Sequence, residues 1–182
     1  MAAPTARYRP TARVLHWLVA LLVIATIPVG QTMIQQGLPR GLQNALFIFH
    51  KNVGVIIFLL VALRLAFRAI FPAPPLPDHV PEYQRRIAPW THWLLYALLL
   101  VMTISGYLRV EAGDFPIEGL DALGIPPLVA PNDTLEEIAK TTHYYARYPL
   151  VALILLHIGA GLYHLLWLRD GVFGRIWPIL GR

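Results

Sequence analysis

The sequence of 182 residues contains no cysteine. Disulfide bridges, cysteine-ligated iron–sulfur clusters and the C-x-x-C-H attachment of a c-type haem are therefore excluded. Cysteine usage also carries no information about the redox compartment. Any metal or cofactor must be held by other side chains, and the seven histidines are the first candidates.

Charged residues are also scarce. They make up 14% of the chain, where a soluble domain carries roughly 25%, and 57% of the residues are hydrophobic. Apolar runs of about twenty residues or more are typical of helices that cross a bilayer. The composition therefore predicts an all-α integral membrane protein with a single domain, residues 1–182, and four spans at about 13–34, 44–71, 90–108 and 138–168.

The first apolar run follows Arg7, Arg9 and Arg13, which is also the outline of a signal peptide. The run is longer than the apolar region of a signal peptide, and no small-x-small cleavage site follows it. We therefore expect it to be kept as the first span.

Acidic residues number only ten, and seven of them lie between Arg109 and Glu137. Ten of the 15 Lys and Arg residues lie on the side that carries both termini, and five lie on the other side. By the positive-inside rule both termini are cytoplasmic, and the acidic loop faces the opposite side of the membrane. The basic residues flank the apolar runs, so the expected partner is membrane lipid and no nucleic acid. Four spans with short connections predict an antiparallel four-helix bundle, which can hold cofactors between facing helices.

The last span carries a stripe of three histidines, His143, His157 and His164, spaced by 14 and 7 residues. Both spacings nearly close on whole helical turns, so the three side chains share one face. A rise of about 1.5 Å per residue separates His143 from His157 by about 21 Å, on the scale of the hydrocarbon core. Ionisable side chains inside a membrane are costly and indicate a function. The stripe predicts two cofactor levels across the bilayer.

Six of the seven histidines lie inside or at the edge of a span, and His79 alone lies in the proline-rich loop as a solvated side chain. The six divide into an outer group and an inner group, which are His50 and His143, and His16, His92, His157 and His164. One histidine at a span end is explained by hydrogen bonding at the interface. Six histidines at two depths in the membrane favour two haem b groups, each held by two histidines. Depth alone does not choose the inner ligands, because His16 can pair equally well with His157 or with His164.

Zinc is the first competing ligand, but it prefers three or four donors at one point and often takes a carboxylate or cysteine. No acidic residue lies in the expected spans to complete such a site. Small residues near the histidines can make room for a macrocycle, and close helix packing explains each of them equally well. These residues are Gly54, Gly106, Gly159 and Gly161.

Several motifs follow one another along the chain. They are R-x-L-H-W at Arg13–Trp17, H-x-x-x-G at His50–Gly54, R-L-x-x-R at Arg64–Arg68 with P-x-P-P at Pro72–Pro75, H-W-L-L-Y at His92–Tyr96, and H-x13-H-x6-H from His143 to His164. In order and spacing this set resembles the bacterial cytochrome b561 family, four-helix membrane proteins with two haems. The resemblance covers nearly the whole chain. It departs where Tyr144 replaces an acidic residue and where a proline is absent around Thr103.

The resemblance implies ligands for each haem. His50 and His143 correspond to the ligands of the outer haem, and His16 and His157 to those of the inner haem. His92 and His164 are then left near the inner haem, where they can hydrogen-bond a quinone and pass protons to it. Some members of the family take electrons from superoxide at the outer haem and reduce ubiquinone at the inner side.

Two cations near the outer level, Lys51 and Arg147, can steer an anion such as superoxide or pair with haem propionates. The leading hypothesis is thus an oxidoreductase of the superoxide:ubiquinone type in the bacterial inner membrane. One alternative is a haem b subunit that links a separate periplasmic dehydrogenase or hydrogenase to quinone. The other is a non-redox transporter or assembly protein.

Overall fold

The structure is a computed structural model that describes residues 7–177. Helices make up its regular structure, and no strand occurs within these residues. Four helices are long and apolar enough to cross a membrane. They are α1 (Pro10–Thr32), α2 (Arg40–Ile70), α3 (Glu82–Ala112) and α5 (Asp133–Leu162), and the last continues through a π-helical segment, η1 (Tyr163–Leu168). The predicted all-α fold with four spans is confirmed.

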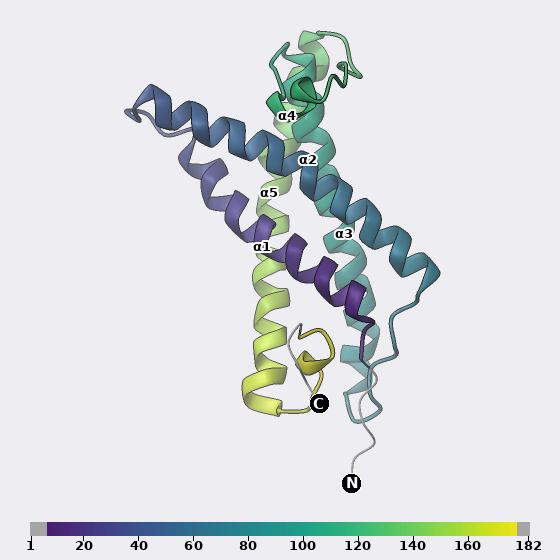
Figure 1. The fold of residues 1–182 in the computed structure, drawn as a ribbon. Coiled ribbons are helices and arrows are strands. Elements are labelled where there is room, and N and C mark those ends of the chain that lie inside the picture. Colours follow the sequence, from purple (N-terminus) through teal and green to yellow (C-terminus); the bar gives the residue numbers. More distant parts are fainter. Residues whose placement is uncertain (1–6, 178–182) are drawn as a thin grey trace.

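Two short helices complete the described chain. Helix α4 (Glu118–Ala122) lies in the acidic connection between α3 and α5, and the 3₁₀ turn η2 (Phe173–Arg175) follows η1. Figure 1 shows α3 and α5 side by side, with the antiparallel hairpin of α1 and α2 crossing them obliquely. Helix α2 packs on α3, and this contact connects the α1–α2 hairpin to the α3–α5 pair. We call the end of the molecule that carries α4 the α4 end, and the opposite end, where α1 begins and η2 lies, the terminal end.

Local sequence explains where these helices begin. Pro10 occupies the first turn of α1, where its missing N–H costs nothing, and Pro39 and Pro81 precede α2 and α3 as N-caps. Helix α5 is capped by Asn132, whose side-chain oxygen accepts a 2.9 Å hydrogen bond from the backbone N–H of Leu135.

Helix α3 begins at Glu82, eight residues before the start at Trp90 that the sequence predicted. The prediction treated the six prolines from Pro72 to Pro89 as one connector. Only Pro89 lies inside the helix, so a single backbone hydrogen bond is lost there. The first turn gains support from a 2.5 Å ion pair between Glu82 and Arg86.

The buried core is small and lies where the α1–α2 hairpin meets α3. Its members are Val19, Val23, Val53, Ile57, Val61 and Tyr96. Many other apolar side chains of the long helices are exposed; Leu59 and Leu155, for example, are 59% and 65% exposed. An outward apolar surface around a sparse interior suits a protein whose solvent is lipid.

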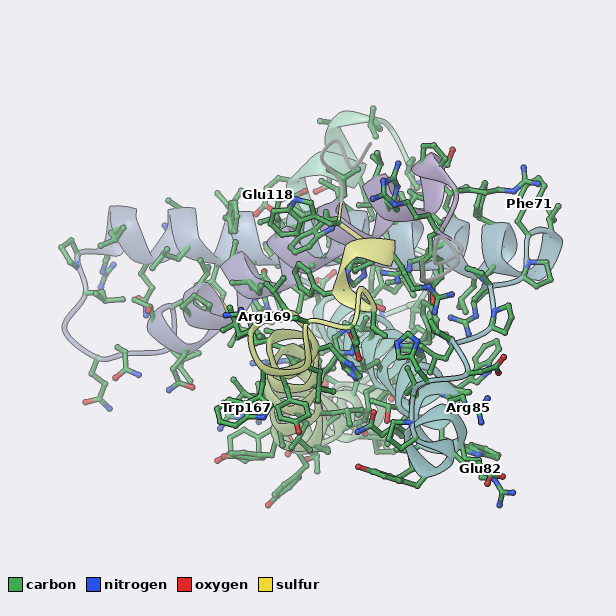
Figure 2. The ribbon with its side chains drawn as sticks, turned by 90° about the horizontal axis from the view of Figure 1, so that it is seen from below. Phe71, Glu82, Arg85, Glu118, Trp167 and Arg169 are labelled. Carbon is green, nitrogen blue, oxygen red and sulfur yellow. The ribbon has the colours of Figure 1, made fainter. Side chains whose placement is uncertain are left out.

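A cap at the terminal end ties three distant segments together. Arg175 is 2% exposed and donates to the carbonyl oxygens of Pro74 and Pro75 at 2.7 and 2.8 Å. The Tyr8 N–H donates to the Arg175 carbonyl oxygen, which adds the segment before α1. Figure 2 views the molecule from this end, with Trp167 and Arg169 at the end of η1 and Glu82 and Arg85 at the start of α3.

Candidate functional site

Two histidines face each other near the α4 end, His50 from α2 and His143 from α5. Their ring centres are 6.2 Å apart and the ring planes are inclined at 81°. We call them the α4-end pair. The helices that carry them are far apart in sequence, so the pairing is made by the tertiary fold.

Three histidines gather towards the terminal end, and we call them the terminal-end group. His16 of α1 and His157 of α5 have ring centres 6.2 Å apart with planes inclined at 78°. The ring centres of His92, from α3, and His157 are 5.5 Å apart. The structure thus brings together His16 and His157, which the family resemblance had paired.

The spacing of these imidazoles has a direct chemical meaning. A metal–nitrogen bond is about 2 Å long, and an imidazole nitrogen lies roughly 1 Å from the ring centre, so two imidazoles on one iron have ring centres about 6 Å apart. The 6.2 Å separations of His50–His143 and His16–His157 both match this value. Within residues 7–177, no group of three or more His, Asp or Glu side chains is placed to hold a metal ion by itself.

Hydrogen bonds orient the α4-end pair. His143 Nδ1 lies 2.9 Å from the carbonyl oxygen of Met102 and 3.3 Å from the Ser105 hydroxyl. Because a carbonyl only accepts, Nδ1 carries the hydrogen and Nε2 keeps a free lone pair, the arrangement usual for a metal-binding histidine. His50 Nδ1 lies 3.5 Å from the Thr26 hydroxyl.

Glycines make space for the rings of this pair. A Cβ atom on Gly30 would lie 2.7 Å from His50 Cε1, and one on Gly106 would lie 3.1 Å from His143 Cε1. Gly106 therefore accommodates an imidazole. Gly30 was missed from the sequence, where its only signal is a glycine inside an apolar span.

The other glycines singled out from the sequence differ in their surroundings. A Cβ atom on Gly54, one turn after His50, would meet no atom within 4 Å, and the same holds for Gly159. A Cβ on Gly161 would touch the Phe173 ring at 3.6 Å, so this glycine serves packing of the C-terminal cap. Imidazole spacing, a fixed tautomer and open space beside His50 together fit a bis-histidine haem.

Two arginines of α2 lie beside the terminal-end group. Arg64 Nη1 is 2.8 Å from His16 Nδ1, and its guanidinium lies 5.4 Å from the centre of the Tyr96 ring. Arg68 lies 5.5 Å from the Trp93 ring. Arg68 lies in the last turn of α2, and Arg64 lies one turn further inside. A cation inside a span is costly, and the two arginines provide the charge that an acidic cofactor group would need. The sequence had placed both arginines in a motif without assigning them a role.

His164 is separate from the terminal-end group. Its Nδ1 lies 2.6 Å from Asp170 Oδ2, and the two side chains are 14% and 12% exposed. The other carboxylate oxygen, Oδ1, accepts a 3.1 Å hydrogen bond from the Val172 N–H. Asp170 was missed from the sequence, where the only signal was an acidic residue just after the final span. His79 lies exposed in the proline-rich loop, as expected.

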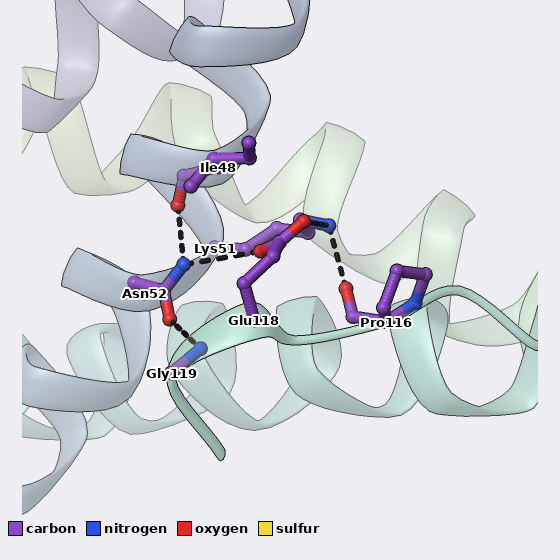
Figure 3. A network of polar contacts seen from close by, with 6 residues as sticks. All are labelled: Ile48, Lys51, Asn52, Pro116, Glu118 and Gly119. Atoms are coloured by element: carbon purple, nitrogen blue, oxygen red, sulfur yellow. Dashed lines mark hydrogen bonds and ion pairs between the residues drawn. The ribbon is translucent and has the colours of Figure 1, made fainter. Parts of the chain in front are cut away.

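Lys51 lies next to His50 and fastens α4 to α2. Its ammonium group is 2.8 Å from a Glu118 carboxylate oxygen and 2.5 Å from the Pro116 carbonyl oxygen. Asn52 donates to the other Glu118 oxygen at 3.1 Å and accepts from the Gly119 N–H at 2.7 Å (Figure 3). Burial alone raises the pKa of Glu118, but these hydrogen bonds outweigh it and leave the pKa below the usual value of a glutamate.

Arg147 lies on the surface of α5 about one turn from His143. Its guanidinium is 4.1 Å from the centre of the Tyr144 ring and 4.7 Å from that of Tyr148, and it donates to the Tyr148 hydroxyl at 2.8 Å. The structure places it with these tyrosines, in a cluster accessible from outside the bundle.

Four apolar spans with facing imidazole pairs define a membrane protein of the cytochrome b class. A family model described as "Prokaryotic cytochrome b561" matches residues 7–178. The chain is 29% identical over 152 residues to cytochrome b561 homolog 2 of Escherichia coli K12, covering 83% of this chain and 80% of that protein. It is 25% identical over 174 residues to cytochrome b561 homolog 1 of the same organism, covering 94% and 97%.

The chain therefore belongs to the prokaryotic cytochrome b561 family. Membership makes it a multi-pass protein of the inner membrane that binds haem b and transfers electrons. The motif-based identification made from the sequence is confirmed.

Proposed function

We propose that this protein carries electrons across the inner membrane through two bis-histidine haems, from superoxide on the periplasmic side to ubiquinone. The observation that supports this best is the repeated 6.2 Å separation of the His50–His143 and His16–His157 rings. His143 and His157 lie on one helix, 14 residues and thus about 21 Å apart, so the haems occupy opposite halves of the bilayer. Haem, when bound, supplies the one-electron redox chemistry, and the protein supplies ligands and surroundings.

The orientation is part of this proposal. The positive-inside rule favours a cytoplasmic terminal end and a periplasmic α4 end. The acidic connection that contains α4 then covers the periplasmic side, close to the α4-end pair. Electrons enter at His50 and His143 and leave near His16 and His157.

Each remaining site residue has a proposed role. Arg64 and Arg68 pair with propionates of the haem held by His16 and His157, since both guanidinium groups lie at that level. His92 and His164 contact the quinone or supply its protons. At the α4 end, Arg147 is the better candidate for attracting superoxide, because Lys51 is already paired with Glu118. Lys51 supports the site by holding α4 beside His50.

The first experiment measures haem content. The purified protein should be red and contain two haems b per chain by pyridine haemochrome assay, and a colourless preparation would favour a non-redox membrane protein. His50→Ala and His143→Ala should remove the same haem, and His16→Ala and His157→Ala the other. Loss of different haems within a pair would overturn this assignment.

The second experiment tests donor and acceptor. Haem reduction is followed after mixing with a xanthine–xanthine oxidase system, with superoxide dismutase as the control, and ubiquinone-1 is then added. Dismutase-sensitive reduction followed by reoxidation supports the proposal. Reduction that instead requires an added periplasmic dehydrogenase or hydrogenase would show that the protein serves as the haem subunit of a larger complex.

A further inference from the structure

The contact between His164 and Asp170 depends on an unusual end to the last span. The two residues are six apart, so on a continuous helix they would point in different directions, about 9 Å apart along the axis. A π-helical segment carries His164, and Arg169 then adopts a left-handed conformation with φ of 50°. This conformation turns the chain back so that Asp170 faces the His164 ring at 2.6 Å.

The backbone conformation that brings Asp170 to His164 costs free energy, and such a cost indicates a functional role. A non-glycine residue in the left-handed region costs about 1 kcal/mol, and π-helical turns occur often at functional sites. A buried carboxylate is also costly unless its oxygens are hydrogen-bonded. Both oxygens of Asp170 have partners, one in the His164 ring and the other in the Val172 N–H.

The hydrogen bond determines which nitrogen of His164 is available. An ionised carboxylate accepts only, so Nδ1 of His164 holds a hydrogen whether the ring is neutral or protonated. Within residues 7–177, no hydrogen bond reaches the other nitrogen, Nε2. That nitrogen can therefore take up a proton and release it to a ligand.

We propose that Asp170 is a positioning residue that holds His164 ready to donate a proton through Nε2 to a carbonyl oxygen of a bound quinone at the terminal end. This inference rests on the proposed function, because the haems must deliver the electrons. Two one-electron oxidations of the donor supply two electrons to the quinone. Each electron is accompanied by one proton, so the product is the hydroquinone. His164 Nε2 gives its proton to a quinone oxygen and is reprotonated from water at the terminal end, while the hydrogen bond between Nδ1 and Asp170 is kept.

The test separates quinone reduction from haem chemistry. Asp170→Asn removes the charge and one acceptor oxygen, so Nδ1 and the Val172 N–H can no longer both be satisfied. The protein, loaded with haem, is reduced with a stoichiometric amount of dithionite and mixed with ubiquinone-1 or with ferricyanide, which takes an electron without a proton. We expect reoxidation by ubiquinone-1 to slow about 10- to 100-fold, with the haem spectrum and reoxidation by ferricyanide unchanged.

Further variants keep the test decisive if Asp170→Asn folds poorly. Asp170→Glu should restore much of the ubiquinone rate, because it keeps the carboxylate. His164→Gln should slow the reaction as much as Asp170→Asn, and the double variant should be no slower than either single one, since the two residues act as a unit. Asp78→Asn, an exposed aspartate at the same end that pairs with Arg85, is the matched control and should react at the wild-type rate.

Each outcome has one meaning. If wild-type haem is not reoxidised by ubiquinone-1, the quinone part of the proposed function fails, whatever Asp170 does. If the wild type reacts and Asp170→Asn reacts equally fast, the role of Asp170 is overturned while the proposed function stands. Equal slowing with ubiquinone-1 and ferricyanide would also overturn it, because the substitution would then affect electron transfer in general.

Discussion

Arg64 donates a 2.8 Å hydrogen bond to Nδ1 of His16 inside the membrane-spanning part of the molecule. A guanidinium group only donates, so in this arrangement Nδ1 accepts and the hydrogen of the neutral ring lies on Nε2. Iron binding through Nε2 requires the opposite tautomer. Arg64 then needs another acceptor, and an acidic group of the cofactor is a chemically suitable one.

Replacement of Arg64 tests this relationship. A cation near a haem stabilises the reduced form, which carries one positive charge less, so Arg64→Gln should lower the midpoint potential of the haem that we propose His16 and His157 bind. Charges that interact at about 1–2 kcal/mol correspond to a shift of roughly 40–90 mV for one electron. Spectroelectrochemical titration measures this shift. Arg86→Gln, which changes an exposed arginine at the same end, is the control, and an equal shift in both variants would contradict the assignment.

Gly30 is predicted to be required for the haem at the α4 end. In Gly30→Ala the new Cβ atom would lie 2.7 Å from His50 Cε1, closer than unbonded carbon atoms approach each other, so the imidazole must move. We expect the haem content to fall from the proposed two per chain to about one, with the remaining spectrum that of the haem assigned by our proposal to His16 and His157. Gly41→Ala is the matched control, because a Cβ there meets no atom within 4 Å. Full haem content in Gly30→Ala would refute this prediction.

The sequence predicted those features that depend on helical periodicity. The 14-residue spacing from His143 to His157 required two levels on one face, and the apolar runs required four spans. It could not choose between His157 and His164 as the partner of His16, because both lie on the same stripe. In the structure His157 contacts the rings of His16 on α1 and His92 on α3, whereas His164 is hydrogen-bonded to Asp170, and this difference supports the proposal that His157 is the partner of His16.

Other contacts escaped prediction for the same reason. Glycine is the residue that usually adopts a left-handed conformation, and its presence in a sequence can indicate such a turn. The left-handed residue here is Arg169, so the sequence gave no indication of the turn. The sequence suggested that Lys51 steers an anion or pairs with a haem propionate, and it gave no sign of the contact with Glu118, which lies 67 residues away. Such pairings depend on how the helices are arranged, which spacing within one segment does not encode.

The buried guanidinium of Arg175 should be important for stability. Arg175→Ala removes hydrogen bonds to the carbonyl oxygens of Pro74 and Pro75 and leaves a hole under the proline-rich loop. We expect a loss of about 2–4 kcal/mol, seen as a fall in melting temperature of at least about 4 °C in detergent. Arg86→Ala, which removes an exposed ion pair at the same end, should change it by less than about 2 °C. If Arg175→Ala and Arg86→Ala lowered the melting temperature equally, the hydrogen bonds of Arg175 would contribute little to stability.

The attachment of α4 to α2 should weaken in acid. The folded-state pKa of Glu118 lies below the ordinary value of a glutamate, so its ionised form stabilises the folded arrangement. This stabilisation is complete above the ordinary pKa and is lost as the pH falls through the lowered one, which places the change below about pH 4. Hydrogen exchange of the α4 amides, corrected for the intrinsic rate at each pH, should therefore accelerate below that point in the wild type.

Two variants separate this effect from general acid unfolding. In Glu118→Gln the α4 amides should exchange faster already at pH 7 and show little further change in acid, because the titrating group is gone. Asp121→Asn alters an exposed acidic residue of the same helix and should keep the wild-type profile. If α4 of the wild type is equally protected from pH 7 down to the onset of acid unfolding, the ion pair between Lys51 and Glu118 does not hold α4 in place.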